Sequence, residues 1–324
     1  MNLRHSAVAI VLTLFAATAI AQAPAPPANP PAPATPLPGS RTVQGIRNKI
    51  SAGDLPSAES ILEVHRGQVG EDGTYLMALG WLARGALLVG EPERARELND
   101  ELRRRCDARL AQGVDLAKND SLENALGASI EIEAQLRERA HGRDAAANYV
   151  RAELAKFPGP VAFRSRLYKR LNLLTLVGSP APEPVVEDFV GSRPAPLSEL
   201  RGHPVVVFVW AEGCGDCKAQ SATLGRVAAR YAPQSLKVVP LTRYYEENEA
   251  DRVGEKARVD SVWADVYKAM GPASIPISTE SAQRYGGSST PTFVFVDRRG
   301  VVRGYTPTRL TEAALERRVR ELVR

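Results

Sequence analysis

The chain has 324 residues, long enough for two folded domains, and its 44% hydrophobic content is sufficient to bury substantial cores. The formal net charge is +5, but Lys and Arg are interspersed with Asp and Glu, and only 6% of the residues are aromatic. Without a basic arm or aromatic stacking platforms, the sequence argues against nucleic acid as a partner.

The first 21 residues have the pattern of an export signal. Arg4 and His5 precede an apolar run from Ala7 to Ile20, and Ala19-Ile20-Ala21 fits the small-x-small rule for cleavage. This run is shorter than the ~20 apolar residues that span a bilayer, so residues 1–21 are predicted to be a signal peptide. The alternative is an uncleaved membrane anchor, the one case in which we expect contact with a membrane.

Residues 22–39 contain eight prolines, mostly separated by alanines. This composition cannot pack a core and favours extended polyproline II conformations. We interpret the segment as a linker, either a spacer or a tail with no spacing role.

Residues 40–176 are predicted to form an all-α domain, because apolar residues recur at three- and four-residue spacing. Turn signals at 53–56, 90–93 and 141–144 divide the pattern into helical pairs. It resembles degenerate tetratricopeptide-type pairs, although the turns lack that family's regular ~34-residue period. We expect this domain to be a docking surface for a partner or substrate, or a dimerisation element.

A proline-rich stretch at 178–184 marks a boundary, and residues 180–324 read as an α/β domain. Apolar runs predict strands at 205–210, 236–241, 291–296 and 301–305, the last two joined by a turn at 297–300. Helices are expected at 215–231, between 248 and 270, at 279–285 and at 311–323.

Cys214 and Cys217 follow the first of these strands and begin the first of these helices. Unpaired N–H groups and the helix dipole favour negative charge there, so Cys214 should be held partly as thiolate, the form that attacks disulfides. Cys217 lies three residues on, at the same side of the first turn. It is the natural resolving thiol, and the pair would interconvert dithiol and disulfide with no cofactor.

At this point the sequence resembles the thioredoxin superfamily, and within it the TlpA/ResA-like extracytoplasmic group. The shared features are Pro180-Ala181-Pro182, the segment 197–202, Trp210-Ala211, the cysteine pair, a long insertion between the second and third core strands, and Ser289-Thr290-Pro291-Thr292.

The resemblance implies a thiol–disulfide oxidoreductase of the periplasm or another extracytoplasmic space. Its partners would be protein thiols and disulfides together with an unidentified redox partner. It further implies that Pro291 is cis and faces the cysteine pair, and that the backbone of Thr290 binds substrate. Whether the physiological direction is reduction or oxidation does not follow from the motif.

Several residues depart from the family pattern. Gly213 precedes the first cysteine where a large residue is usual, and Asp216 stands where proline is frequent. Phe208 and Gln220 occupy positions at which two branches of the family place an acid. Our hypothesis is that Asp216 or Glu212 accepts the Cys217 proton through water, and that the charge of Asp216 raises the pKa of Cys214.

Other interpretations remain open. The cysteine pair could be half of a zinc site, although His65, His141 and His203 lack ligand spacing to it, and we expect no metal. A peroxidatic role is also conceivable, but the peroxiredoxin signature is absent. The chain could instead be mainly a helical scaffold whose thioredoxin-like domain turns over poorly.

Cys106 is the third cysteine, and it shares a helical face with Leu98, Leu102 and Leu110. This spacing favours a small apolar core residue. The alternative is a partner in an intermolecular disulfide or redox contact, since an odd cysteine in an exported chain is otherwise a liability.

Overall fold

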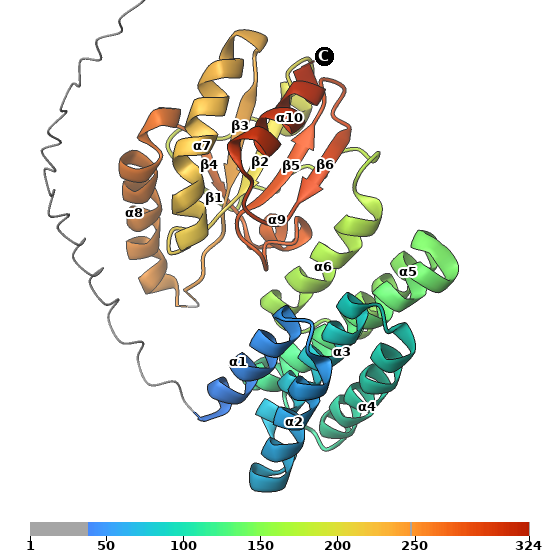
Figure 1. Cartoon of the computed structure of the whole chain (residues 1–324). Coiled ribbons are helices and arrows are strands. Elements are labelled where there is room, and N and C mark those ends of the chain that lie inside the picture. The colour runs from blue at the N-terminus through green and yellow to red at the C-terminus, as the bar shows by residue number, and fades with distance from the viewer. Residues whose placement is uncertain (1–37, 247, 324) are drawn as a thin grey trace, which may run out of the picture. The chain divides into compact units, whose positions relative to one another are not determined.

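The computed structural model describes residues 38–246 and 248–323 (Figure 1). The predicted signal peptide and most of the predicted linker lie outside the described residues. The first helix already begins at Pro38, two residues before the expected start of the helical domain.

Helices and the turns between them make up residues 38–177, as the periodicity predicts. Its elements are α1 (Pro38–Ser51), α2 (Leu55–Val69), α3 (Gly73–Val89), α4 (Pro92–Ala111), η1 (Leu116–Lys118), α5 (Asp120–Lys156) and α6 (Val161–Thr175). Side chains that accept backbone N–H bonds begin three of these helices, namely Asp54, Asp72 and Asn119.

The break predicted at 141–144 is confirmed, because α5 consists of two helical segments that meet at a kink. Gly142, at this kink, has the non-helical values φ 84° and ψ 176°. A glycine tolerates this backbone conformation without a steric penalty, so one residue redirects the chain. Further interruptions lie before Asp120 and after Lys156.

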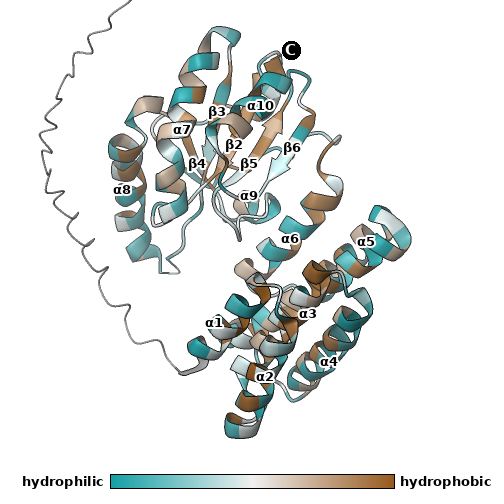
Figure 2. Ribbon diagram, viewed as in Figure 1, coloured by the Kyte–Doolittle hydropathy of each residue, from teal (hydrophilic) through white to brown (hydrophobic). Residues whose placement is uncertain are grey.

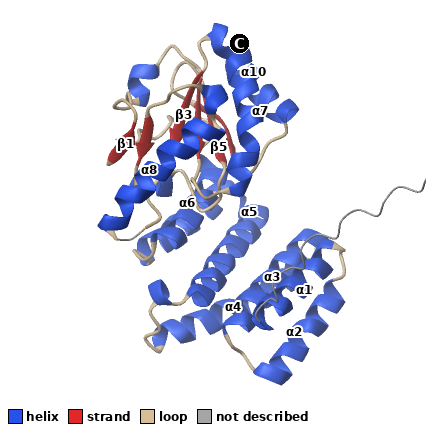
Figure 3. Ribbon diagram, turned by 90° about the vertical axis from the view of Figure 1, so that its left-hand side faces the viewer, coloured by secondary structure: helices blue, strands red, loops and turns tan. Residues whose placement is uncertain are grey.

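The later part of the chain is an α/β fold. Its elements are β1 (Asp188–Val190), η2 (Leu197–Leu200), β2 (Val205–Val209), α7 (Gly215–Tyr231), η3 (Ala232–Gln234), β3 (Lys237–Leu241), α8 (Glu249–Val266), η4 (Lys268–Met270), β4 (Ile275–Ile277), α9 (Thr279–Arg284), β5 (Thr292–Val296), β6 (Val302–Thr306) and α10 (Glu312–Val323). The four strands and four helices expected from the sequence are present within one or two residues, and every described strand follows α6 (Figure 3).

The central sheet is mixed, with strand order β3-β2-β5-β6. β2 runs parallel to β3 and antiparallel to β5, and β5 forms a hairpin with β6. A second, two-stranded sheet pairs β1 with β4, and neither of these short strands was expected from the sequence. Three residues each are too few to give a recognisable alternation of apolar and polar side chains.

Both faces of the central sheet are covered, which explains why β2 and β5 are buried at every position and almost wholly apolar (Figure 2). Val206 and Phe208 of β2 face the layer formed by α7, α8 and α10. Val205, Val207 and Val209 point to the other face, where they pack with Tyr285, just after α9. A five-residue run without polar interruption is the expected sequence of such a doubly covered strand.

Helix α6 belongs to two hydrophobic cores. Leu167 and Leu174 pack in the core of the helical region, and Leu176, directly after the helix, packs in the core of the α/β fold. Asn172 donates a hydrogen bond of 2.9 Å from Nδ2 to the carbonyl oxygen of Arg284 in α9. The helical region is therefore fixed to the α/β fold at the end of α9.

A glycine allows this close approach. Gly286 has a φ of +74°, and a Cβ built on it would lie 2.6 Å from the Cα of Lys169 in α6 and 2.6 Å from the Tyr305 hydroxyl. Only a residue without a side chain fits there. The backbone of α6 thus rests on the segment that leads from α9 to β5.

Among the described residues, no helix combines the length and the apolar composition that crossing a bilayer requires.

Candidate active site

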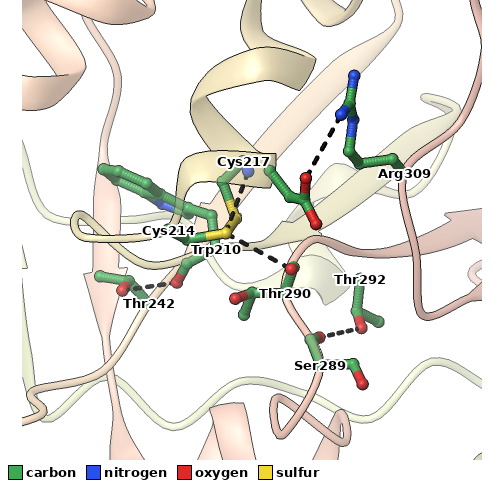
Figure 4. Close-up of a disulfide and its surroundings, with 9 residues drawn as sticks. Trp210, Cys214, Cys217, Thr242, Ser289, Thr290, Thr292 and Arg309 are labelled. Carbon is green, nitrogen blue, oxygen red and sulfur yellow. Dashed lines mark hydrogen bonds and ion pairs between the residues drawn. A yellow bond between two sulfur atoms is a disulfide. The ribbon is translucent and has the colours of Figure 1, made fainter. Parts of the chain in front are cut away.

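Cys214 and Cys217 lie at the N-terminus of α7, directly after β2, as the sequence predicts (Figure 4). They form a disulfide with a Cα–Cα distance of 5.2 Å. Cys214 is the N-cap residue of α7, and its Sγ accepts a hydrogen bond of 3.0 Å from the backbone N–H of Cys217. In the reduced form this N–H and the helix dipole would stabilise a thiolate on Cys214.

The two sulfurs differ in their access to solvent. Cys214 is half-buried, whereas Cys217 is fully buried within the core between the sheet and α7. A large substrate can therefore reach only Cys214. This asymmetry matches the division into an attacking and a resolving thiol.

The Thr290–Pro291 peptide bond is cis, as the resemblance implies. The carbonyl oxygen of Thr290 lies 3.4 Å from Cys214 Sγ, so the loop faces the disulfide (Figure 4). Thr292 supports the loop from behind, because its Oγ1 donates a hydrogen bond of 2.7 Å to the carbonyl oxygen of Ser289. Thr290 is partly exposed, so this residue is accessible beside the sulfur.

Trp210 supports the active-site turn from inside the core. It is fully buried, its ring lies against those of Trp263 and Tyr267, and its Nε1 donates a hydrogen bond of 3.3 Å to the carbonyl oxygen of Pro240. Its own carbonyl oxygen accepts a hydrogen bond of 2.9 Å from Thr242 Oγ1. Trp210 is held at both ends, so the turn that follows begins from a fixed point.

Both acids proposed to modulate the site are ion-paired. Asp216 Oδ1 lies 3.4 Å from Arg309 Nη1, and both side chains are more than half exposed. Glu212 accepts a hydrogen bond of 2.9 Å from Arg258 Nε, which raises the pKa of Arg258. Acceptance of the Cys217 proton by either acid stays a prediction.

The two positions at which related branches carry an acid hold no charge here. Phe208 is fully buried, with ring centroids 5.2 Å from Phe293 and 5.9 Å from Tyr267. Gln220 is also buried, and its Oε1 accepts a hydrogen bond of 2.9 Å from the backbone N–H of Leu310. Its Nε2 has no hydrogen-bond partner in the part of the chain that the structure describes.

A cavity of about 570 Å³ opens beside Cys214. The active-site turn and the loop before Pro291 form one side of it, and the insertion between β3 and β5 forms another through Arg243, Tyr245 and Arg258. The remaining wall comes from the helical region, where α6 contributes Arg166 and Lys169. Its volume lies within the ~300–1,000 Å³ typical of small-ligand sites.

The sequence analysis did not predict these cavity walls, but one residue could have indicated them. Glu255 lies at four-residue spacing from Val259, which is followed at the same spacing by Trp263, and the latter two are buried. It is therefore an acidic residue on an otherwise apolar helix face. The structure explains it, because the Glu255 carboxylate accepts the backbone N–H groups of Tyr245 and Glu246 at 2.8–3.1 Å. Glu255 thereby fixes the loop that borders the cavity.

No group of three or more His, Cys, Asp or Glu side chains that could hold a metal ion occurs among residues 38–246 and 248–323.

Residues 198–318 match the family model of a thioredoxin-like domain, while no curated protein matches the chain. Similar solved structures include a secreted Mycobacterium tuberculosis disulfide oxidoreductase described as homologous to E. coli DsbE, with 20% identity and a TM-score of 0.32, covering 39% of this chain and 86% of that one. A putative thiol:disulfide interchange protein DsbE from Chlorobium tepidum has 18% identity and a TM-score of 0.36, covering 46% and 98%. A thiol-disulfide isomerase from Corynebacterium glutamicum has 19% identity and a TM-score of 0.37, covering 44% and 96%.

The chain contains a thioredoxin-like domain with a mixed sheet and a Cys214–Cys217 pair, and an all-helical region precedes this domain.

Proposed function

We propose that the protein is an extracytoplasmic thiol–disulfide oxidoreductase of the TlpA/ResA-like type that exchanges protein disulfides through Cys214 and Cys217. The observation that carries the proposal is the pairing of a half-buried sulfur at a helix N-terminus with a fully buried one, opposite Thr290. The leader pattern of residues 1–21 supports export. Disulfide chemistry persists in such compartments.

The reaction proceeds in two exchanges. The Cys214 thiolate attacks one sulfur of a substrate disulfide, forming a mixed disulfide, and the other substrate sulfur leaves as a thiolate that takes up a proton. Cys217 then loses its proton and attacks Cys214 Sγ, which releases the second substrate thiolate. Two electrons pass to the substrate and the protein retains the Cys214–Cys217 disulfide. The reverse sequence oxidises a dithiol.

Thr290 is the proposed substrate platform in this scheme. Thr290 is partly exposed and its carbonyl group borders Cys214, so an extended substrate segment would lie along this residue while the substrate sulfur meets Cys214. Pro291 cannot donate a backbone hydrogen bond and leaves the carbonyl group of Thr290 facing the disulfide. Trp210 would hold the turn in place during both exchanges.

Insulin reduction in the presence of a small dithiol tests the proposal. Wild-type protein should accelerate the reaction, Cys214→Ser should abolish the acceleration, and Cys106→Ala should retain it. Cys217→Ser should instead accumulate a mixed disulfide that mass spectrometry detects. If wild type and Cys214→Ser reduce insulin equally slowly, the enzymatic proposal is wrong and a scaffold role replaces it.

The scaffold alternative rests on a specific observation. No carboxylate occupies the positions of Phe208 or Gln220, and the resolving thiol is buried beside them in the same layer. A poorly accepted proton would slow the release step. The helical region, which we predict to be tetratricopeptide-like, would then serve mainly to bind partners.

A further inference from the structure

The cavity beside Cys214 is lined by charged side chains of both signs, and two of its cations come from the helical region. Arg166 and Lys169, one turn apart on α6, both line it, with side chains 17% and 21% exposed. Neither residue belongs to the segment that matches the thioredoxin-like family. The helical region therefore adds two cations to Arg243 and Arg258, which the thioredoxin-like domain supplies.

A buried carboxylate orients both cations. Glu131 of α5 is 7% exposed, and its oxygens lie 2.8 Å from Arg166 Nη2, 3.3 Å from Lys169 Nζ and 2.9 Å from Arg84 Nη2. Burial alone would raise the pKa of Glu131, but the three cations outweigh burial and lower it to about 2. Glu131 is consequently ionised at neutral pH and cannot neutralise all three partners.

The ammonium group of Lys169 retains unused hydrogen-bond donors. Glu131 also pairs with Arg84 and Arg166, and Glu123 of α5 is the further carboxylate on this side of the cavity. Arg166 already donates to Glu131 and to the carbonyl oxygen of Asn124. Lys169 has an ion pair with Glu131 alone among the described residues, which leaves ammonium donors for a ligand.

Backbone contacts fix the position of Lys169, and its side chain takes no part in them. Its backbone Cα and N lie against Gly286, four residues before Thr290. The same helix residue thus touches the segment leading to the substrate platform and lines the cavity that contains Cys214. A ligand sulfur at Cys214 and a ligand anion at Lys169 would share one cavity.

We propose that this cavity binds a short cysteinyl peptide segment through a carboxylate that pairs with Lys169 on the helical wall while the cysteine sulfur reacts at Cys214. A charge-assisted hydrogen bond in a partly desolvated site favours the carboxylate form over an uncharged one. The segment is either a free low-molecular-weight peptide disulfide or an extended piece of a protein. The inference rests on the proposed thiol–disulfide exchange.

The test uses the disulfide-linked dimer of acetyl-Cys-Gly in two forms, one with the free C-terminal carboxylate and one with the carboxamide. Second-order rate constants for oxidation of the reduced protein are measured by chromatography of the released thiol. Wild type should prefer the carboxylate by about tenfold, equal to about 1.4 kcal/mol. Lys169→Met should bring the ratio close to one.

Lys118→Met is the matched control, because Lys118 is 84% exposed and lies outside the cavity lining. It should retain the wild-type ratio. Far-UV circular dichroism of Lys169→Met should match wild type, since the contact with Gly286 uses only backbone atoms of residue 169. A wild-type ratio near one, or a preference that survives Lys169→Met, would overturn the inference.

Failure of the underlying function gives a different result. If wild type exchanges with neither peptide nor with insulin, the proposed function fails and the inference falls with it. If exchange occurs without the carboxylate preference, only the inference fails.

Where the preference is observed, competition shows whether the bound segment comes from a protein or from a free peptide. The carboxylate peptide inhibits insulin reduction if protein segments enter the same cavity. It leaves insulin reduction unchanged if free peptide disulfides are the substrates.

Discussion

Asp216, between the two active-site cysteines, pairs with Arg309 at 3.4 Å. Arg309 lies between β6 and α10, so a residue more than ninety positions away offsets the acid at the N-terminus of α7. An anion near the first turn of a helix is stabilising for the helix but disfavours a second negative charge on a neighbouring thiol. The pair therefore sets how strongly Asp216 opposes the Cys214 thiolate.

Replacing Asp216 and replacing Arg309 should move the pKa of Cys214 in opposite directions. Asp216→Asn removes the opposing charge and should lower it, whereas Arg309→Gln frees the acid and should raise it, each by about 0.2–0.7 pH unit. Ultraviolet thiolate absorbance of the reduced protein against pH measures both. An unchanged Cys214 pKa in the two variants would contradict the role assigned to Asp216.

Adding a methyl group at residue 286 should separate α6 from the loop before Pro291. Gly286→Ala combines a positive φ with a Cβ 2.6 Å from the Lys169 backbone, so we expect a loss of about 2–4 kcal/mol in unfolding free energy and slower disulfide exchange. Gly90→Ala is the matched control, with φ +87° and no atom within 4 Å of the new Cβ.

Urea denaturation followed by circular dichroism gives the two unfolding free energies. The control should lose only the backbone cost, about 1 kcal/mol, and should keep its exchange rate. Equal losses in the two variants would mean that the contact between Gly286 and α6 contributes nothing.

Acidic pH should destabilise the helical region, because Glu131 becomes protonated. Its pKa falls from 4.5 to about 2 on folding, so the folded state binds fewer protons than the unfolded state in this range. The stabilisation, about 3 kcal/mol, is present above pH 4.5 and is lost as pH falls towards 2. Glu131→Gln should flatten this part of the pH profile.

The same substitution should destabilise the protein at pH 7 by about 3–5 kcal/mol, because it leaves Arg84, Arg166 and Lys169 without their buried counter-charge. Glu63→Gln serves as the control, since Glu63 is 55% exposed and pairs only with Arg66. A Glu131→Gln variant with the wild-type pH profile of urea midpoints would refute the assignment.

Cys106 should be chemically silent in the folded protein. It is fully buried in the core of the helical region, and burial raises the pKa of its thiol to about 12. With the reduced native protein at pH 8, iodoacetamide should label Cys214 and should reach Cys106 only after denaturant is added. Native labelling of Cys106, or a Cys106-linked species in non-reduced mass spectra, would favour the intermolecular alternative.

The α/β part of the fold could be predicted from sequence because its strands are buried on both faces. The short apolar runs 205–209 and 293–296, rich in valine and phenylalanine, favour buried strands, and the Cys pair and Thr290-Pro291 locate the site relative to them. The turn at 297–300 could also be predicted from its residue types. In the structure the Asp297 carboxylate accepts hydrogen bonds from the backbone N–H groups of Arg299 and Val301.

The cavity wall could not be predicted, since it depends on residues that lie far apart in sequence. Nothing local distinguishes Lys169 from the other basic residues of α6, and its significance arises only from the packing of that helix on Gly286. The break at Gly142 could be predicted, by contrast, because its turn signal is local in the sequence.

The sharing of α6 between two cores means that the helical region and the α/β fold cannot be separated cleanly at their junction. A fragment beginning at residue 178 would lose the support beneath Gly286, and one beginning at 161 would carry Leu167 and Leu174 into solvent. Domain swaps with other thioredoxin-like modules would meet the same obstacle. Recombination within this protein should therefore succeed only where α6 and the segment from α9 to β5 are exchanged together.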